Sequence, residues 1–297
     1  METRRLEYFV VLASERSFSR ASEVLGISQP ALSQQIARLE RALDTTLFDR
    51  TRQPVELTPA GQALLARCRR IVDLVDGLPD ISARAKTGEV GIVRVGMVNS
   101  LLFSPWVNQR VRAFAQKHPD VRIDVSHDST EAIEQDLLGG RIDVAISYTR
   151  LGPEWLNVAH LYDDPVTLVL PIDHPHAHSA GPVPLHELKD ETFVVFPREV
   201  QSTLYDELVR NCLVAGFSPK LRTSRSSFLD QVGLVGHGMG VAIVPHSVTT
   251  VTIPTVSYQE LDPSAFTTGV YAGWRPSRAN PSKALFLDVL LERADDD

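Results

Sequence analysis

Residues 17–61 constrain the fold of this 297-residue chain more than any other segment. In the first part of it Phe18, Ala21 and Leu25 recur every three or four residues, which places them on one face of a short helix. A glycine ends that run. Ser28 then occupies an N-cap position, and Pro30 suits the first turn of a second helix because its missing N–H is not needed there. The spacing predicts two short helices joined by a tight turn.

The second helix has two faces of different chemistry. Its buried face is expected to be apolar and to consist of Leu32, Ile36, Leu39 and Leu43. The opposite face carries Ser33, Gln34, Arg38 and Arg41. Hydroxyls, amides and cations on one helix face suit the edge of a DNA major groove. An ordinary helical hairpin on a globular surface is the alternative, and the basic hairpin that follows, with Arg50 and Arg52, argues against it.

This segment resembles the winged helix-turn-helix of LysR-type transcriptional regulators. The shared residues stand at fixed spacings: Ala21, Ser22, Leu25, Ser28 to Ala31, Ser33, Ile36, Leu39, Glu40, Leu47, Phe48, Arg50, Leu57, Thr58, Ala60 and Gly61. One departure is Asp44, where the family usually has glycine; aspartate tolerates left-handed backbone better than most residues, so the turn can form. The resemblance implies that eight residues bind DNA: Ser28, Gln29, Pro30, Ser33, Gln34 and Arg38 on the helix, and Arg50 and Arg52 in the wing.

Charge is distributed unevenly along the chain. The net charge is −7, which alone argues against a nucleic-acid partner. Residues 1–70, however, carry 11 Lys and Arg against 8 Asp and Glu, so a mildly basic N-terminal part precedes an acidic remainder. The length favours two domains over a single core. Both observations fit a small DNA-binding module attached to a larger domain.

Cysteine usage and hydropathy predict a cytoplasmic protein. Cys68 and Cys212 lie far apart and form no metal-ligand spacing, so we expect buried thiols, with redox sensing as the alternative. The apolar run from Phe9 to Ala13 is too short for a signal peptide, and no run approaches membrane-spanning length. A membrane partner is therefore not expected.

A long helix is expected after the hairpin. Thr58 and Pro59 form a cap and a first turn, and the helix should reach about residue 85. Its apolar residues form an a/d seam that pairs with another helix: Leu64, Cys68, Ile71, Val75 and Leu78. Packing on its own domain is the alternative. Gly77 and Pro79 predict a kink or an early end. By resemblance this helix is the linker through which such regulators form homodimers or homotetramers.

Beyond the linker, short apolar runs alternate with helical periodicity. Strands are expected at residues 91–98, 121–125, 142–146, 166–170, 193–196, 240–244 and 269–274, and helices at 104–117, 130–138, 202–215, 228–236 and 282–293. This order predicts an α/β domain with a mostly parallel sheet. The resemblance supports two lobes, similar to a periplasmic binding protein. The expected division is a DNA-binding domain at 1–58, a linker at 59–88, and an effector-binding domain at 89–297, with lobe I at 89–163 and 266–297 and lobe II at 164–265.

In open α/β sheets, ligands bind beyond the carboxyl ends of strands and near helix N-termini. Ser100, Ser129 and Thr130 stand at such places, although they could serve as caps alone. Arg150 follows the third strand and could bind a carboxylate, with a surface salt bridge as the alternative. With the resemblance, the expected effector site contains Ser100, Leu101, Ser129, Thr130, Tyr148, Arg150, Phe196, Pro197, Ser202 and Thr203. We expect its ligand to be a small organic anion.

Two further motifs resemble a metal site and a dinucleotide-binding site, but their surroundings do not fit either. His174, His176 and His178 alternate as metal ligands can, but prolines surround them and a solvated loop fits better. Gly236, Gly238 and Gly240 follow a helix and precede a strand, the reverse of the order that a dinucleotide needs. We therefore predict no metal and no cofactor.

The sequence therefore predicts a ligand-responsive transcriptional regulator that binds an interrupted palindrome in double-stranded DNA. By resemblance it also contacts RNA polymerase, and an effector changes the angle between its lobes. Two alternatives belong to other classes. One is a two-lobed small-molecule enzyme with an N-terminal oligomerisation arm, for which no catalytic motif stands out. The other is a solute-binding protein for transport, which the missing signal peptide argues against.

Overall fold

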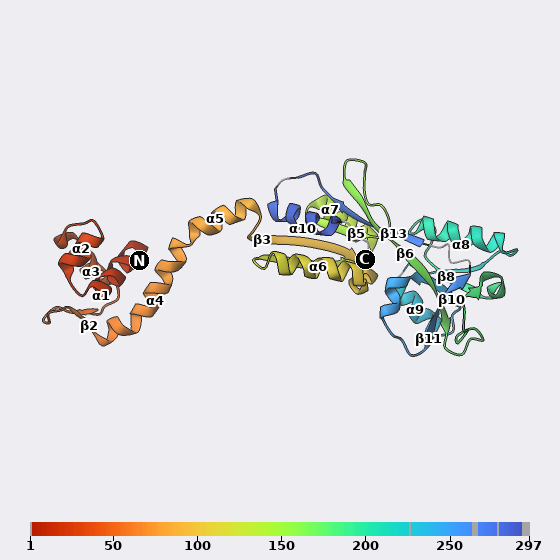
Figure 1. The fold of residues 1–297 in the computed structure, drawn as a ribbon, viewed down its shortest axis with the longest axis horizontal. Coiled ribbons are helices and arrows are strands. Elements are labelled where there is room, and N and C mark those ends of the chain that lie inside the picture. The colour runs from red at the N-terminus through yellow and green to blue at the C-terminus, as the bar shows by residue number, and fades with distance from the viewer. Residues whose placement is uncertain (1, 226, 263–266, 278, 293–297) are drawn as a thin grey trace. The chain divides into compact units, whose positions relative to one another are not determined.

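The computed structural model of the chain describes residues 2–225, 227–262, 267–277 and 279–292. It divides into two compact units, Met1–Arg84 and Ala85–Asp297, each with its own apolar core. The boundary between them falls inside the helix α5 (Leu78–Thr87), which Figure 1 shows as one coil. Within the described residues, none of the helices has both the length and the apolar content that crossing a lipid bilayer requires.

The first unit is a winged helix-turn-helix. Its elements are α1 (Thr3–Glu15), α2 (Phe18–Val24), α3 (Gln29–Ala42), β1 (Phe48–Asp49), β2 (Glu56–Leu57) and α4 (Pro59–Asp76). Ser17, Ser28 and Thr58 each accept a backbone N–H in the first turn of α2, α3 and α4, as N-caps do. Strands β1 and β2 pair antiparallel and form the wing. Asp44 has a φ of 50°, so the left-handed turn that its position requires is present.

The core of the first unit collects the apolar faces that the sequence predicted. Phe9, Leu12, Leu32, Ile36 and Leu39 are fully buried. The aromatic rings of Phe9 and Phe48 meet edge to face at 5.4 Å, which attaches the wing to α1. The stripe on α3 therefore packs inward, and its polar face is left outward.

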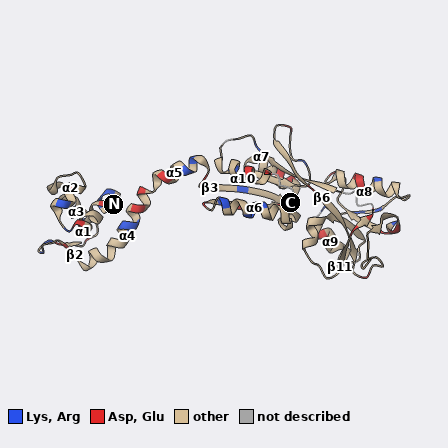
Figure 2. Cartoon of the chain, in the orientation of Figure 1, with Lys and Arg blue, Asp and Glu red and all other residues tan. Residues whose placement is uncertain are grey.

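Helix α4 ends at Asp76, with Gly77 as its C-cap, and α5 follows. The apolar seam that the sequence predicted has a buried part and an exposed part. Leu64 and Cys68 pack into the core of the first unit, so for them the alternative, packing within the domain, is correct. Beyond them the rest of the seam is open to solvent together with two neighbouring apolar residues, Leu74 and Ile81, and we include these two in the exposed seam: Ile71, Leu74, Val75, Leu78 and Ile81 are 40 to 62% exposed. Figure 2 shows charges of both signs along α4 and α5 around these apolar residues.

The second unit contains a mixed sheet. In spatial order its strands are β4 (Val121–Asp128), β3 (Gly91–Val98), β5 (Val144–Ser147), β13 (Thr267–Trp274), β6 (Asn157–Pro171), β10 (Val241–Pro245), β8 (Thr192–Val195) and β9 (Lys220–Thr223). Strand β11 (Val256–Gln259) also pairs with β6, and β7 (Val183–Pro184) with β12 (Leu261–Asp262). Strands β3, β4 and β5 are mutually parallel, as are β8, β9 and β10. The predicted α/β organisation is therefore confirmed, but the sheet is not mostly parallel as expected, because β13 pairs antiparallel with β5 and β6, and β6 pairs antiparallel with β10 and β11.

Two long strands join the lobes. Residues 157–165 of β6 pair with β13, and residues 166–171 pair with β10 and β11. Strand β13 returns the chain to lobe I, where it pairs with β5. In Figure 1 the blue helix α10 (Pro281–Leu291) accordingly lies beside the yellow and green elements of lobe I. In this structure β13 therefore pairs with the sheet of lobe I, and α10 packs on its helix α6 (Pro105–Lys117).

Helices cover both faces of the lobe I sheet. α6 (Pro105–Lys117) and α10 pack together, with the Phe114 and Phe286 rings 5.2 Å apart. α7 (Thr130–Gly139) packs through Ile133 and Leu137 into a separate apolar cluster with Ile142 and Ala145. Lobe II carries α8 (Ser202–Val214) and α9 (Phe228–Gly236). Short 3-10 helices, η1 (Asn99–Phe103), η2 (Leu185–Leu188) and η3 (His246–Thr250), complete the described elements.

The strand predictions were wrong in two respects. The expected strand 166–170 is only the second half of β6, because its polar first half, beginning at Asn157, has no apolar run. Four strands of the second unit were missed: β9 and β11 because they are short and mostly polar, and β7 and β12 because they have only two residues each. Of the three glycines near residue 240, Gly240 lies close to another backbone segment, because a Cβ there would collide with the carbonyl oxygen of Thr192, whereas Gly238 has open space around it.

Candidate DNA-binding and effector sites

The outer face of α3 presents the residues expected to bind DNA. Ser28 caps the helix, and Gln29, Pro30, Gln34 and Arg38 are exposed. Ser33 is half-buried. Gln29 is oriented by the Ser19 hydroxyl, which donates to its Oε1 at 3.1 Å. A helix anchored by a buried apolar stripe and open on a polar side has the form needed to enter a major groove.

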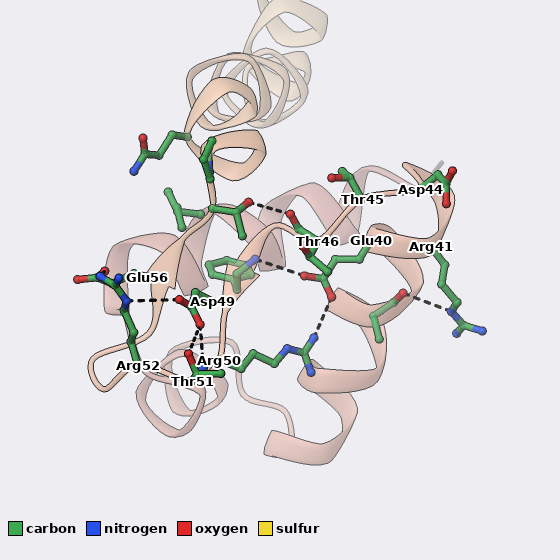
Figure 3. Close-up of a pocket in the computed structure, with 16 residues that line it drawn as sticks. Glu40, Arg41, Asp44, Thr45, Thr46, Asp49, Arg50, Thr51, Arg52 and Glu56 are labelled. Carbon is green, nitrogen blue, oxygen red and sulfur yellow. Dashed lines mark hydrogen bonds and ion pairs between the residues drawn. The ribbon is translucent and has the colours of Figure 1, made fainter.

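The wing is fastened to α3 by the Glu40 carboxylate. Its Oε1 accepts the backbone N–H groups of Leu47 (2.9 Å) and Phe48 (3.3 Å), and its Oε2 accepts the Arg50 guanidinium at 2.9 Å. Figure 3 shows Glu40 pointing from α3 toward Arg50 across an open groove. The guanidinium also lies 3.4 Å from Ser33 Oγ and 5.4 Å from the centroid of the Phe18 ring.

The second wing arginine is also paired within the protein. Arg52 contacts Glu56 at 2.8 Å and Asp49 at 3.4 Å. Hydrogen bonds from Thr51 lower the pKa of Asp49 below its ordinary value, with Arg52 as a minor cause. By contrast, Arg38 has no carboxylate partner among the described residues, and Arg41 bonds only the Ala37 carbonyl oxygen in Figure 3. The unpaired cations of this surface therefore lie on α3 and not in the wing.

A cavity of about 570 Å³ lies between the lobes of the second unit. Its walls follow the carboxyl ends of β3, β4, β5, β8 and β9, where an open α/β sheet binds ligands. The lining residues are Val98, Asn99, Ser100, Asp128, Ser129, Thr130, Glu131, Tyr148, Thr149, Phe196, Val200, Gln201, Arg225, Ser227, Phe228 and Asp230. A space of this size suits a small organic molecule.

The structure brings half of the predicted effector residues to this cavity. Those lining it are Ser100, Ser129, Thr130, Tyr148 and Phe196. Arg150 is exposed and does not line it, because the chain turns away after Thr149. Leu101 is fully buried in η1, whereas Pro197 and Thr203 do not face the cavity. Ser202 begins α8, and its side chain lies outside the described part of the chain.

The cavity contains an arginine that the sequence analysis missed. Arg225 lines the wall formed by lobe II and has no ion-pair partner among the described residues. Asp230 lies near it, but its Oδ2 accepts the Ser227 N–H and hydroxyl, both at 2.8 Å, in a capping box at the start of α9. The sequence has a capping-box pattern here, because Ser227 is followed three residues later by Asp230, and this pattern could have located the start of α9. The Phe228 ring packs against those of Tyr148 (5.3 Å) and Phe196 (4.9 Å).

Buried polar groups connect the cavity to the strands that join the lobes. The Tyr148 hydroxyl of lobe I lies 3.2 Å from Ser247 Oγ of lobe II, and burial raises the pKa of Tyr148. Asp164, on β6 where it crosses between lobes, accepts the Ser247 N–H at 3.3 Å through Oδ1, whereas its buried Oδ2 has no partner among the described residues. Burial raises the pKa of Asp164. This network lies beside the strands that join the two lobes.

The histidine segment has an acidic partner for two of its residues. His176 contacts Glu187 at 2.9 Å and His174 contacts Glu191 at 3.4 Å, so His174, only 11% exposed, is not part of a freely solvated loop as expected. Within the described residues, no three His, Cys, Asp or Glu side chains gather closely enough to hold a metal ion. Cys68 and Cys212 are buried free thiols, and burial raises the pKa of Cys212 to about 12.

Two family models match the chain. The bacterial regulatory helix-turn-helix protein of the lysR family matches residues 3–62, and the LysR substrate binding domain matches residues 86–295. The chain belongs to the LysR family of bacterial transcriptional regulators. Among LysR-type relatives, it is similar to the HTH-type transcriptional regulator AlsR of Bacillus subtilis, with 31% identity over 97% of this chain and 95% of AlsR. It is also similar to the HTH-type transcriptional regulator BudR of Raoultella terrigena, with 30% identity over 97% of this chain and 100% of BudR.

Solved LysR-type structures share the fold. CbnR, described as a LysR family transcriptional regulator, aligns with a TM-score of 0.72 at 24% identity, covering 98% of this chain and 100% of CbnR. CbnR has also been solved with its target DNA, and the effector-binding domain of BenM with its effector benzoate. AlsR and BudR are named as transcriptional regulators, which agrees with the prediction of a regulator and not an enzyme.

Proposed function

We propose that this LysR-type regulator binds an interrupted palindrome in promoter DNA with the outer face of α3. The observation that carries this proposal is the polar face of α3, held outward by a fully buried apolar stripe and flanked by the wing. Ser28, Gln29, Pro30, Ser33, Gln34 and Arg38 would approach the major groove, and the wing with Arg50 and Arg52 would lie beside it. CbnR, which has the same fold, was solved with its target DNA.

Two chains are needed to read a palindrome, and the exposed seam offers a surface for pairing. Ile71, Leu74, Val75, Leu78 and Ile81 present apolar side chains that a second copy can cover. In this proposal residues 1–58 bind DNA, residues 59–88 pair the chains, and residues 89–297 bind the effector. The lobes would meet near residue 163, and the second expected boundary, at residue 266, lies outside the described residues. Such a homodimer or homotetramer would act on DNA in the cytoplasm and contact RNA polymerase.

We also propose that a small organic anion binds in the cavity and changes the angle between the lobes. Arg225 of lobe II would supply positive charge. From lobe I, Ser100 and the start of α7, where Ser129 is the N-cap and Thr130 the first residue, would supply hydrogen-bond donors and the positive potential of a helix N-terminus. Phe196, Phe228 and Tyr148 would contact an apolar part of the ligand. The benzoate bound to BenM combines these two features.

A mobility-shift assay on the upstream region of the protein's own gene tests DNA binding. Ser33→Ala combined with Gln34→Ala should weaken binding about 10- to 100-fold through lost contacts to bases. Gln109→Ala, exposed on α6 of the second unit, is the matched control and should leave binding unchanged. Full affinity in the double variant would move the DNA-binding face elsewhere.

Isothermal titration against a panel of carboxylates, benzoate included, tests the effector site. Arg225→Gln should weaken binding of any carboxylate that binds by about tenfold or more, because a charged hydrogen bond is lost. Arg150→Gln is the matched control outside the cavity and should have no effect. The reverse result would return Arg150 to the site and remove Arg225.

A further inference from the structure

The Glu40–Arg50 pair occupies a decisive place on the DNA-binding surface. Arg50 comes from the wing, yet its guanidinium lies over α3, 3.4 Å from the hydroxyl of Ser33, one of the residues expected to reach bases. The Glu40 side chain beneath it is 12% exposed, and that of Arg50 is 42% exposed. A cation is therefore held beside the residues that would enter the groove, with its charge already balanced by a carboxylate.

Glu40 has a second task that fixes its position. Its Oε1 accepts two backbone N–H groups at the start of the wing, at Leu47 and Phe48. The carboxylate therefore cannot rotate away from Arg50 without leaving both N–H groups unpaired, which is costly for half-buried groups. These three hydrogen bonds make Glu40 a fixed counter-charge, unlike the flexible surface pairs that exchange readily with solvent.

We propose that Glu40 is a positioning residue that orients Arg50 and withholds its charge from DNA phosphates, so that the wing arginine adds little sequence-independent attraction. This inference rests on the proposed DNA-binding function. A cation that pairs with a phosphate releases a counterion, and each such contact makes log K fall more steeply with log salt, by about 0.9. A guanidinium that is already neutralised releases none. Binding to arbitrary DNA is thereby kept low, and discrimination depends more on the polar face of α3.

The test measures affinity of the full-length protein for a random-sequence duplex of about 40 base pairs between 50 and 200 mM salt. In Glu40→Gln the amide oxygen can still accept the two backbone N–H groups, but the charge on Arg50 is freed. We expect the salt slope to steepen by about 0.9 per DNA-binding head, with tighter binding at low salt. A purely structural role for Glu40 would weaken binding without steepening the slope.

Asp44→Asn is the matched control. Asp44 lines the same groove and has no ion pair among the described residues, and asparagine tolerates its φ of 50°. It removes the same charge without freeing an arginine, so its slope should match that of the wild type. Equal steepening in Asp44→Asn and Glu40→Gln would overturn the inference, because net charge would then explain both.

Arg50→Gln completes the cycle and keeps the test decisive if Glu40→Gln fails to fold. Alone it should leave the slope unchanged, and in the Glu40→Gln background it should restore the wild-type slope. A flattening of about 0.9 per head by Arg50→Gln alone would show that Arg50 pairs with phosphate despite Glu40, which contradicts the inference. A wild-type protein that fails to bind any duplex at 50 mM salt would instead refute the proposed DNA-binding function itself.

Discussion

The DNA-binding unit and the effector-binding unit treat their polar groups in opposite ways. In the first unit the functional polar residues are on the outside: the face of α3 is solvated, and the wing arginines are paired with carboxylates. In the second unit polar groups are buried near the cavity and some lack partners among the described residues, including Asp164 Oδ2, Gln201 Oε1 and Gln231 Nε2. In the DNA-binding unit the wing arginines have carboxylate partners. In the effector-binding unit several buried polar atoms have no hydrogen-bond partner among the described residues.

This difference suits two different tasks. A surface that reads DNA must be rigid before binding, because each side chain that is ordered on contact costs affinity. A cavity that responds to a ligand must have two arrangements of similar free energy, between which the ligand shifts the population. The buried groups around Tyr148, Ser247 and Asp164 lie between the lobes, where such a change would occur.

The largest expected effect comes from removing core side chains in either unit. Ile36→Ala and Leu208→Ala each delete a fully buried side chain, at a cost of about 2 to 5 kcal/mol. Because the two cores are separate, calorimetry should show that each variant lowers one unfolding transition and leaves the other in place. If both transitions move together, the two units do not unfold independently.

A somewhat smaller effect should follow from charges on the exposed seam. Leu74→Asp with Leu78→Asp places two carboxylates on the apolar surface that we assign to pairing, where each buried leucine contributes about 1.5 to 3 kcal/mol. We expect sedimentation to show monomers whose fold is intact by circular dichroism. Ala63→Asp, at an exposed position of α4 outside the seam, is the control and should leave association unchanged. Unchanged association in the double variant would exclude the seam as the interface.

Asp164 should give the effector unit an unusual pH dependence. Burial raises its pKa, so the folded state holds the proton more tightly than the unfolded state does. Its contribution to stability is then fully present below about pH 3.9 and is lost as the pH rises through the folded-state pKa. Asp164→Asn should therefore be more stable than the wild type by about 1 to 3 kcal/mol at pH 7 and show no advantage near pH 3.5. Denaturant titrations at both pH values measure this, and a variant less stable at pH 7 would contradict it.

The smallest effect is expected at the cysteines. Both thiols are buried, and burial raises the pKa of Cys68 and of Cys212, so little thiolate forms at neutral pH. Ellman's reagent should label neither in the native protein and both after unfolding. Rapid native labelling would reopen the redox-sensing alternative.

The two units also differ in how far their sequences predict them. The caps at Ser28 and Thr58 and the stripe on α3 are local signals, and the structure confirms them. The partner of the seam was harder to predict. The spacing shows that Leu64 and Cys68 face another helix, but it does not show whether that helix belongs to the same unit, as it does here.

The effector cavity shows where local signals end. Its walls come from segments that follow five strands, and their neighbours in space are far apart in sequence. Arg150 was expected there because it follows a strand. The strand ends at Ser147, and of the residues after it Tyr148 and Thr149 line the cavity but Arg150 does not. Arg225 follows β9, a strand too short and polar to be recognised, so its place could not be assigned. Which of these loops meet at the cavity depends on the order of the strands in the sheet, and local sequence signals do not contain that order.

Hydrogen exchange on the full-length protein, with and without its upstream DNA, shows which backbone segments DNA protects. If α3 and the wing bind DNA, exchange slows in the backbone of residues 28–41 on α3 and of residues 48–57 in the wing and does not change on α6 or α8. Protection elsewhere, with α3 exchanging as it does in the free protein, would contradict DNA binding by α3 and the wing.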